Sequence, residues 1–272
     1  MSQKNLNNKY PYDLTVITAV KPDRSQFLPE TAASIQELRN ILNVQWIVCW
    51  DGIRPQKTPD ATYEINGEIN SGISATRNLA LPHIKAPFTT PLDADDLIVS
   101  SGCLKAIQHL KESTSQWVGL NRILLSGEKT SHWKDNEKFL PKGSLALNWS
   151  APFEFHPNSF IIKTELLKEI GGWPALSCNE DLGLVLYASE KSDGIFIPSI
   201  LTKYRVWDGQ EVQSESYIKR KYNSFSIIES IINQRRENIG ATKINSPVNP
   251  GGAWGVINEA YSKVCTHLTP TN

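Results

Sequence analysis

The chain has 272 residues, of which 40% are hydrophobic, and this is enough for one large core or for one catalytic domain with a small addition. Lysine plus arginine and aspartate plus glutamate number 28 each, so the formal net charge of zero excludes a global attraction to nucleic acid or to an anionic membrane. The four cysteines form no CxxC pair, which leaves zinc-finger and thioredoxin functions without a basis in the sequence.

The sequence gives no sign of a targeting or membrane-spanning segment. Residues 1–10 are polar and rich in asparagine, without the apolar region of a secretory signal. No apolar run approaches the ~18 residues that a membrane-spanning helix requires. We therefore expect a soluble, cytoplasmic protein without a transmembrane segment, for which peripheral contact with a membrane stays open.

Strands and helices alternate from the start of the chain. The β-branched run at 14–18 predicts a buried strand, and a helix opens at Pro29 with apolar residues at helical spacing. A second strand is expected at 46–50, where Asp51-Gly52 stops it. Strand, helix and strand at this spacing predict a βαβ unit with a parallel pair of strands.

The alternation continues through the middle of the chain. A helix is expected at 74–81, a strand at 88–92, a second helix near 101–111 and a further strand near 117–125. Residues 126–158 form a loop-rich stretch with scattered aromatic side chains and indicate no regular element.

The last third predicts shorter elements and then one long helix. A strand and two helices are expected, at 160–162, 164–170 and 180–189. An apolar stripe from Tyr217 to Ile232 predicts a helix that Gly240 closes. The stretch 241–255 is rich in Gly, Pro and Asn and indicates a mobile tail or lid.

Acidic residues follow two of the expected strands. Asp51 ends the strand at 46–50, and Asp93, Asp95 and Asp96 follow the strand at 88–92. Ligands in open α/β sheets gather at the carboxyl ends of strands, so these acids are expected to share a site. Close carboxylates repel one another, and a hard cation such as Mg²⁺ or Mn²⁺ removes that cost. The alternative is a solvated acidic turn that caps a helix.

Motifs in the first half of the chain support the metal interpretation. The segment 90–97, TPLDADDL, resembles the LDADD form of the DxD motif in family 2 glycosyltransferases. The segment 70–78, NSGISATRN, resembles the N-x-G-x-x-x-A-R-N segment of that family, with Thr76 where alanine is usual. The strand Val16–Val20 and Trp50-Asp51-Gly52 resemble the two nucleotide-binding strand ends.

Downstream motifs extend the resemblance. Gly171-Gly172-Trp173 followed by Asn179-Glu180-Asp181 resembles the GG[FW]…ED pair of the family, and all the motifs together cover roughly residues 14–210 in the expected order. The resemblance implies an α/β fold of GT-A type: a Rossmann-like mixed, mainly parallel sheet flanked by helices, in a single domain with a C-terminal helical extension.

The implied domain is residues 1–212. Its nucleotide-sugar half is about 12–100 and its acceptor half about 101–212, and residues 213–272 form a C-terminal helix and tail that pack on it.

The resemblance also implies a donor site. The backbone of the first strand end contacts the base, and Asp51 accepts a hydrogen bond from a ring N–H such as uracil N3. Arg77 approaches the base or the phosphates, Asp93 lies near the ribose, and Asp95 binds Mn²⁺ or Mg²⁺ with support from Asp96. The full donor set is Thr18, Ala19, Val20, Asp51, Arg77, Asp93, Ala94 and Asp95. For Asp51 the alternative is a plain turn residue, and for Arg77 a surface ion pair.

By the same resemblance, Asp181 is the general base, with Glu180 as its supporting neighbour. Gly172 and Trp173 border the acceptor. In Tyr204-Arg205-Val206-Trp207-Asp208, which resembles a YR-x-H segment, Arg205 would neutralise diphosphate and Asp208 would replace the usual histidine as metal ligand. A plain helix-terminal acidic pair is the alternative for Glu180 and Asp181.

These residues together predict an inverting, metal-dependent hexosyltransferase. One sugar would pass from a nucleotide-sugar, most simply a UDP-sugar, to the hydroxyl of a saccharide, lipid-linked sugar, peptide or small molecule by direct displacement. No QxxRW signature of processive polymerases is found, which favours transfer of a single sugar.

Two other functions are weighed against this one. A nucleotidyltransferase would need a glycine-rich basic loop after the first strand, whereas residues 19–23 contain no glycine. A non-catalytic module of GT-A fold that binds a nucleotide-sugar or sugar is the alternative that stays open.

Overall fold

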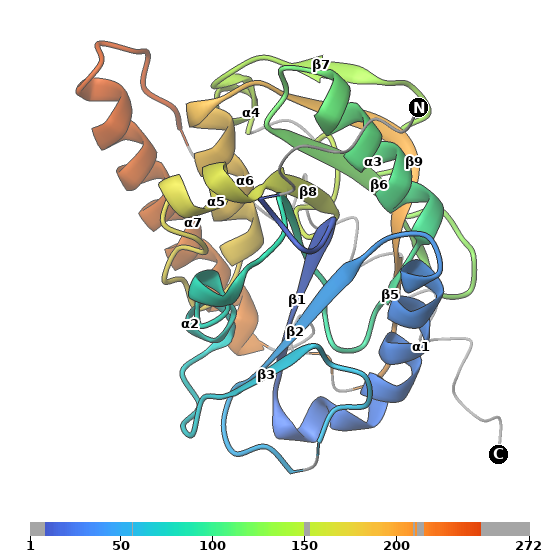
Figure 1. Ribbon diagram of the computed structural model, residues 1–272. Coiled ribbons are helices and arrows are strands. Elements are labelled where there is room, and N and C mark those ends of the chain that lie inside the picture. The colour runs from blue at the N-terminus through green and yellow to red at the C-terminus, as the bar shows by residue number, and fades with distance from the viewer. Residues whose placement is uncertain (1–8, 56, 150–152, 209, 211–214, 246–272) are drawn as a thin grey trace, which may run out of the picture.

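The computed structural model describes residues 9–55, 57–149, 153–208, 210 and 215–245. The expected tail or lid at 241–255 lies outside the described residues from position 246 onward. Figure 1 shows the chain as a ribbon from its N-terminal half in blue to the last described helix in red.

The N-terminal half builds the expected βαβ unit. Strand β1 (Leu14–Val20) leads through a 3₁₀ turn, η1 (Pro22–Phe27), into helix α1 (Leu28–Arg39), and β2 (Val44–Trp50) returns parallel to β1. The edge strand β3 (Tyr63–Asn66) pairs parallel with β2, and it was not predicted from the sequence.

The following elements complete the first half and begin the second. They are α2 (Ile73–Asn78), η2 (Leu81–His83), β4 (Phe88–Pro91), β5 (Leu97–Ile98), α3 (Ser100–Glu112), β6 (Trp117–Leu124), β7 (Lys138–Leu140) and α4 (Ser144–Leu147). The predicted helices and strands in this part are confirmed, with α2 ending earlier than expected. The stretch 126–158, expected to be loop, contains the short elements β7 and α4.

The last third consists of β8 (Phe160–Lys163), α5 (Thr164–Glu169), α6 (Glu180–Lys191), β9 (Gly194–Tyr204) and α7 (Glu215–Glu237). The strand β9 was not predicted from the sequence, and it pairs parallel with β6. The ladder skips from Ile197 to Ile200, so that Pro198 and Ser199 have no partner in β6. A proline lacks the N–H that a ladder needs, and the skip accommodates it.

All nine strands form one sheet in the order β3-β2-β1-β4-β8-β6-β9-β5, with β7 attached to β9. The pairings give β1, β2, β3, β4, β6 and β9 a common direction, and β5, β7 and β8 the opposite one. The mixed, mainly parallel sheet expected from the sequence is therefore confirmed.

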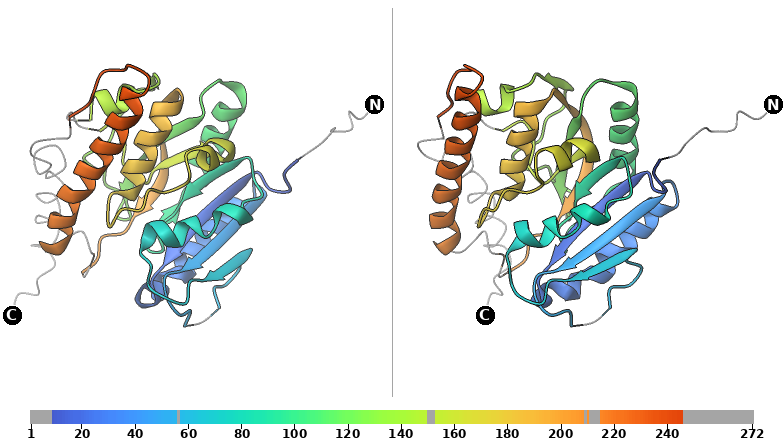
Figure 2. Two further views of the ribbon diagram at one scale, coloured as in Figure 1. Left: turned by 90° about the vertical axis from the view of Figure 1, so that its left-hand side faces the viewer. Right: turned by 60° about the vertical axis from the view of Figure 1, so that its left-hand side comes forward.

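Helices cover both faces of the sheet, as Figures 1 and 2 show. In β1, Val16 points into a core with α1 and α3, while Ile17 belongs to a second core with α5, α6 and α7. Successive residues of a strand face opposite sides, and in β1 both faces are covered, so that all its residues except Ala19 are buried. Within the described residues, no helix is both long and apolar enough to cross a bilayer.

Helix α7 belongs to the second core. Phe225, Ile228 and Ile232 are buried, and the Phe225 ring lies edge-on to Trp149 with centroids 5.5 Å apart. The guanidinium of Arg236 binds both carboxylate oxygens of Glu190 in α6, at 2.8 and 2.6 Å, and so fixes the end of α7. The amphipathic stripe predicted from the sequence is confirmed at these positions, whereas Tyr222, which was expected in the same stripe, is exposed.

Candidate active site

Asp51 stands where β2 ends and is only 2% exposed. Its Oδ1 accepts hydrogen bonds from the backbone N–H groups of Ser71 at 2.6 Å and Gly72 at 3.0 Å, which hold the loop before α2. Its Oδ2 is buried and has no hydrogen-bond partner among the described residues. A buried acceptor without a donor is costly, so this oxygen is prepared to accept a hydrogen bond from a ligand.

The other residues expected to bind the donor, three in β1 and Ala94 after β4, differ in their burial and hydrogen bonds. Thr18 is buried, and its Oγ1 accepts a hydrogen bond from the Trp46 indole at 3.0 Å. Val20 is buried and its carbonyl accepts the N–H of Asp51 at 2.8 Å, whereas Ala19 is partly exposed. The carbonyl of Ala94 accepts the Thr31 hydroxyl at 2.8 Å, which ties α1 to the loop after β4.

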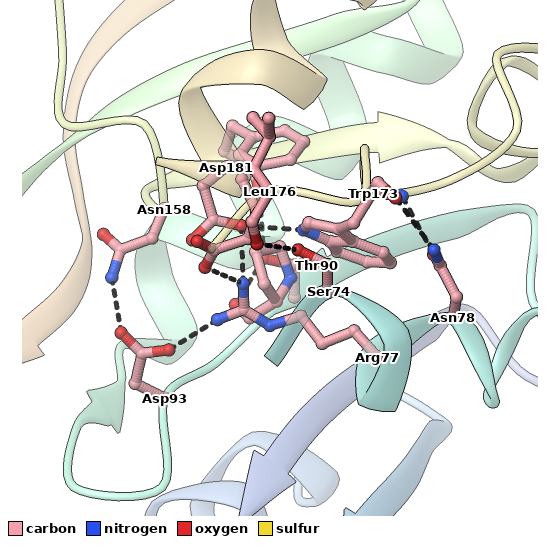
Figure 3. A network of polar contacts seen from close by, with 12 residues as sticks. Ser74, Arg77, Asn78, Thr90, Asp93, Asn158, Trp173, Leu176 and Asp181 are labelled. Carbon is pink, nitrogen blue, oxygen red and sulfur yellow. Dashed lines mark hydrogen bonds and ion pairs between the residues drawn. The ribbon is translucent and has the colours of Figure 1, made fainter. Parts of the chain in front are cut away.

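Arg77, in α2, joins the two halves of the site (Figure 3). Its side chain is buried, Nη1 donates to Glu180 at 2.9 Å and to Asp181 at 2.8 Å, and Nη2 donates to Asp93 at 2.6 Å. Burial by itself would lower the pKa of Arg77, but the charges of Asp181, Asp93 and Glu180 outweigh it and raise that pKa. The guanidinium therefore stays charged and holds three carboxylates in place. The surface ion pair weighed for Arg77 is wrong.

A clamp connects α2 to the glycine-rich loop before α6, and Figure 3 shows both sides of it. The Asn78 amide donates to the Trp173 carbonyl at 2.8 Å and accepts the Trp173 N–H at 2.9 Å. A Cβ on Gly172 would lie 2.4 Å from Oδ1 of Asn78, and φ is +76° there, so glycine is required by both space and conformation. The motifs that contain Asn78 and Gly172 are thus one packing unit.

Trp173 supports Asp181 instead of offering a ring face. The side chain is 2% exposed, and its indole Nε1 donates to Oδ1 of Asp181 at 2.7 Å. A sugar ring could not stack on Trp173 in this structure, so the expected acceptor contact is replaced by a contact that orients the carboxylate. Gly172, also expected at the acceptor, is buried in the clamp.

Glu180 and Asp181 begin α6, directly after Asn179, whose φ of 58° is left-handed. Burial, followed by the charge of Asp181, raises the pKa of Glu180 to about 7. Burial also raises the pKa of Asp181 and outweighs the opposing charge of Arg77. Oδ1 of Asp181 accepts two hydrogen bonds, while none reaches its Oδ2 in the part of the chain that the structure describes. This free oxygen can take a proton.

The raised pKa of Glu180 predicts a pH-dependent stability. A carboxyl group with a pKa near 4.5 when unfolded and about 7 when folded favours folding fully below the lower value. That contribution falls as the pH rises from about 4.5 to about 7, because the carboxyl group ionises in the unfolded chain while burial keeps it protonated in the folded one. We expect Glu180→Gln to lose this slope. Melting curves from pH 4 to 8 check it, and parallel curves for both proteins would contradict it.

The acids after β4 meet the segment after β9. Oδ2 of Asp95 accepts the indole N–H of Trp207 at 2.7 Å, and Oδ1 of Asp96 accepts the backbone N–H of Arg205 at 3.0 Å. The Arg205 guanidinium donates to the Asp95 carbonyl at 2.9 Å and to Glu30 at 2.8 Å. Burial and neighbouring carboxylates raise the pKa of Asp95 and of Asp96.

Asp208 was expected to bind the metal ion together with Asp95. Asp208 is exposed, and within the described residues its carboxylate has no hydrogen bond or ion pair. Three or more His, Cys, Asp or Glu side chains poised for a metal ion are likewise not found in the described part of the chain.

Sequence reasoning missed two contacts of the acidic loop. The Asn158 amide donates to Oδ2 of Asp93 at 2.9 Å, while its Oδ1 pairs with Nδ1 of His156 at 2.7 Å. Asn158 lies at the end of the stretch expected to be loop, where no local pattern distinguishes it. In the sequence, Trp207 stands out only because it departs from the YR-x-H pattern. That departure was the one feature that could have pointed to its contact with Asp95.

The fold is that of the GT-A glycosyltransferases. The crystal structure of S. aureus TarS 1–349 is 16% identical with a TM-score of 0.60, over 80% of this chain and 64% of that one. The same part in complex with UDP-GlcNAc is 15% identical with a TM-score of 0.61, over 88% of this chain and 75% of that one.

A further solved structure is the mannosyltransferase PcManGT of Pyrobaculum calidifontis in complex with GDP-Man and Mn²⁺. It is 16% identical with a TM-score of 0.57, over 97% of this chain and 77% of that one. In a longer crystal structure of S. aureus TarS, the match covers 96% of this chain and 44% of that one, so this chain spans less than half of its length. No protein-family model matches the sequence, and no curated protein does.

Proposed function

We propose that this protein is an inverting glycosyltransferase that moves one sugar from a nucleotide-sugar to an acceptor hydroxyl. The observation that carries the proposal is the cluster in which Arg77 joins Asp93, of the DxD motif, to Glu180 and Asp181. The GT-A neighbours complexed with UDP-GlcNAc and GDP-Man support a nucleotide-sugar donor.

The chain's own residues divide the reaction between them. Oδ2 of Asp51 accepts a base N–H, with a UDP-sugar as the first donor to test, and the backbone at Thr18, Ala19 and Val20 lines the base. Asp93, held by Arg77 and Asn158, faces the ribose and sugar side. Arg77 acts through these carboxylates.

Asp181 is the general base of the displacement. Its Oδ2 takes the proton of the acceptor hydroxyl while that oxygen bonds to the anomeric carbon. The bond from the anomeric carbon to the diphosphate oxygen breaks at the same time, and the nucleoside diphosphate leaves. A single displacement inverts the anomeric centre and needs no enzyme nucleophile. Trp173 holds Oδ1 of Asp181, so that Oδ2 faces the acceptor.

The site can provide a divalent cation with few protein ligands. With Oδ2 of Asp95 taken by Trp207, Asp95 offers its Oδ1, and Asp208 offers a carboxylate on an exposed turn. Mg²⁺ and Mn²⁺ accept one or two carboxylates when substrate phosphates and waters complete the shell. When bound, the cation neutralises charge on the leaving diphosphate. The assignments of Arg205 to phosphate and of Ala94 to the donor stay predictions, as do the residue 212 boundary and a cytoplasmic location.

The test of donor binding is a melting-temperature screen with UDP and GDP, each with Mn²⁺ and with a chelator, followed by sugar transfer from a panel of nucleotide-sugars. We expect one nucleotide to raise the melting temperature and Mn²⁺ to increase that shift, because ligand binding to the folded state stabilises it. Nucleotide binding without transfer or hydrolysis from any donor would favour a binding module instead.

Asp95→Asn tests the cation assignment. We expect this variant to bind the nucleotide in chelator as the parent does, and to lose the additional affinity that Mn²⁺ gives. Asp60→Asn, on an exposed turn away from the motif, is the matched control. If Mn²⁺ strengthened nucleotide binding to Asp95→Asn and to the parent equally, Asp95 would not be the ligand.

A further inference from the structure

Arg24 lies beside the acidic loop, and its guanidinium has no hydrogen bond among the described residues. Its Nη1 is 4.0 Å from Oδ2 of Asp95 and its Nε is 3.9 Å from Asp23, both beyond hydrogen-bond distance. The side chain is only 21% exposed, and Nε is buried without a hydrogen-bond partner. A guanidinium carries five N–H donors, so leaving them unused in a mostly buried position is costly.

Trp207 holds this guanidinium in place. The carbon of the Arg24 guanidinium lies 4.5 Å from the Trp207 ring centroid, and the Phe27 ring packs on the same indole with centroids 5.0 Å apart. The Trp207 N–H is fixed by Asp95. Stacking on an indole orients a guanidinium without using its N–H groups. The guanidinium of Arg24 is therefore held in place while its N–H groups stay available to a ligand.

The chemistry at this position differs from that of a metal-binding histidine. An indole N–H is only a donor, so Trp207 cannot ligate a cation, and it occupies one of the two oxygens of Asp95. The other nearby guanidinium, Arg205, already donates to Glu30 and to the Asp95 carbonyl. Of these two arginines, Arg24 is the one whose N–H groups are unused.

The place of Arg24 in the fold matches that of the donor's phosphates. Arg24 follows β1, whose last carbonyl binds the backbone of Asp51, and Asp51 has the oxygen prepared for the base. Its guanidinium also lies near Asp95, two residues after Asp93, which Arg77 joins to Asp181. A group between a base site and an anomeric carbon is the diphosphate of a nucleotide-sugar.

We propose that Arg24, stacked on Trp207, binds the diphosphate of the donor and supplies positive charge beside it. The inference rests on the proposed nucleotide-sugar function. Arg24 would then be the principal contact of the diphosphate, in place of Arg205. We expect the diphosphate to bind even when the divalent cation is removed.

The experiment compares UDP with uridine, and GDP with guanosine if GDP is the nucleotide that binds, by calorimetry in chelator and in Mn²⁺. Arg24→Met keeps an apolar stem on Trp207 and removes the charge. We expect it to weaken UDP binding by about 10- to 100-fold in both conditions, since a charge-assisted pair to phosphate is lost. Uridine binding should change by less than about twofold, because the base site is intact.

Two controls separate phosphate binding from folding. Arg24→Lys restores the charge without the fork and should recover part of the UDP affinity. Arg39→Met removes an equal charge at the end of α1, where the guanidinium binds Asp60 and Thr62, and should leave UDP binding unchanged. The melting temperature of Arg24→Met without ligand should stay within about 2 °C of the parent.

The outcomes are distinct. Equal UDP affinity of Arg24→Met and the parent would overturn the inference and leave the proposed function standing. An equal loss for UDP and uridine would also overturn it, since the variant would then have disturbed the whole loop. If the parent bound neither UDP nor GDP, the proposed function would fall together with the inference.

Discussion

Asp181→Asn should lose most sugar transfer while binding the donor as before. An asparagine cannot take the acceptor proton, and general base catalysis contributes about 10²- to 10⁴-fold to the rate. The fold should tolerate the change because an asparagine Oδ1 still accepts the N–H groups of Trp173 and Arg77, now at 2.7 and 2.8 Å from the carboxylate. Steady-state rates and calorimetric donor affinities measure the two effects separately.

Glu180→Gln is the matched comparison for this variant. Glu180 accepts a hydrogen bond from the same Nη1 of Arg77, at 2.9 Å, so the substitution replaces the neighbouring carboxyl group of the same buried cluster by a neutral amide. We expect a smaller loss of transfer than for Asp181→Asn. If Asp181→Asn kept its rate to within about tenfold while Glu180→Gln lost it, Glu180 would be the base instead.

The sheet could be predicted where apolar runs are local. The strands β1, β2, β4, β6 and β8 are buried runs, and α1, α3 and α6 have apolar residues at helical spacing. The strand β9 was missed because Pro198 interrupts its run. Its partner β6 also lies 77 to 80 residues earlier in the chain, from Trp117↔Gly194 to Leu124↔Tyr204, and no local pattern encodes such a pairing. The edge strand β3 is partly exposed throughout and has no apolar face to detect.

The part of the candidate site that lies at strand ends could also be predicted. Acids at the ends of neighbouring parallel strands must lie along one edge, which is why the motifs indicated a shared site. The contact of Arg77 with Asp181 spans 104 positions and could not be derived from spacing. The resemblance brought both segments to notice but did not indicate that Arg77 is bound to carboxylates. For Trp173 it indicated an open ring, and the structure has a buried one.

Arg77→Met should be among the most destabilising single changes in the chain. It leaves Asp93, Glu180 and Asp181 around a buried position without their shared cation, as Figure 3 makes clear for the two aspartates. Breaking a buried charge pair by removing one partner costs about 3–5 kcal/mol, a large part of the 5–15 kcal/mol typical of a folded domain. Urea unfolding monitored by circular dichroism measures the loss.

The pH dependence of that loss identifies its electrostatic origin. Burial raises the pKa values of Glu180 and Asp181, and the charge of Arg77 offsets only part of that rise. Without Arg77 these folded-state pKa values rise further, so the carboxyl groups stabilise the fold when protonated and lose that contribution as the pH rises. The destabilisation should therefore be larger at pH 8 than at pH 5, and Glu180→Gln added to Arg77→Met should recover part of it. If the destabilisation were independent of pH and unchanged by the second substitution, Arg77 would act through packing alone. Its charge would then not explain how Asp93 on the donor side is connected to the base Asp181.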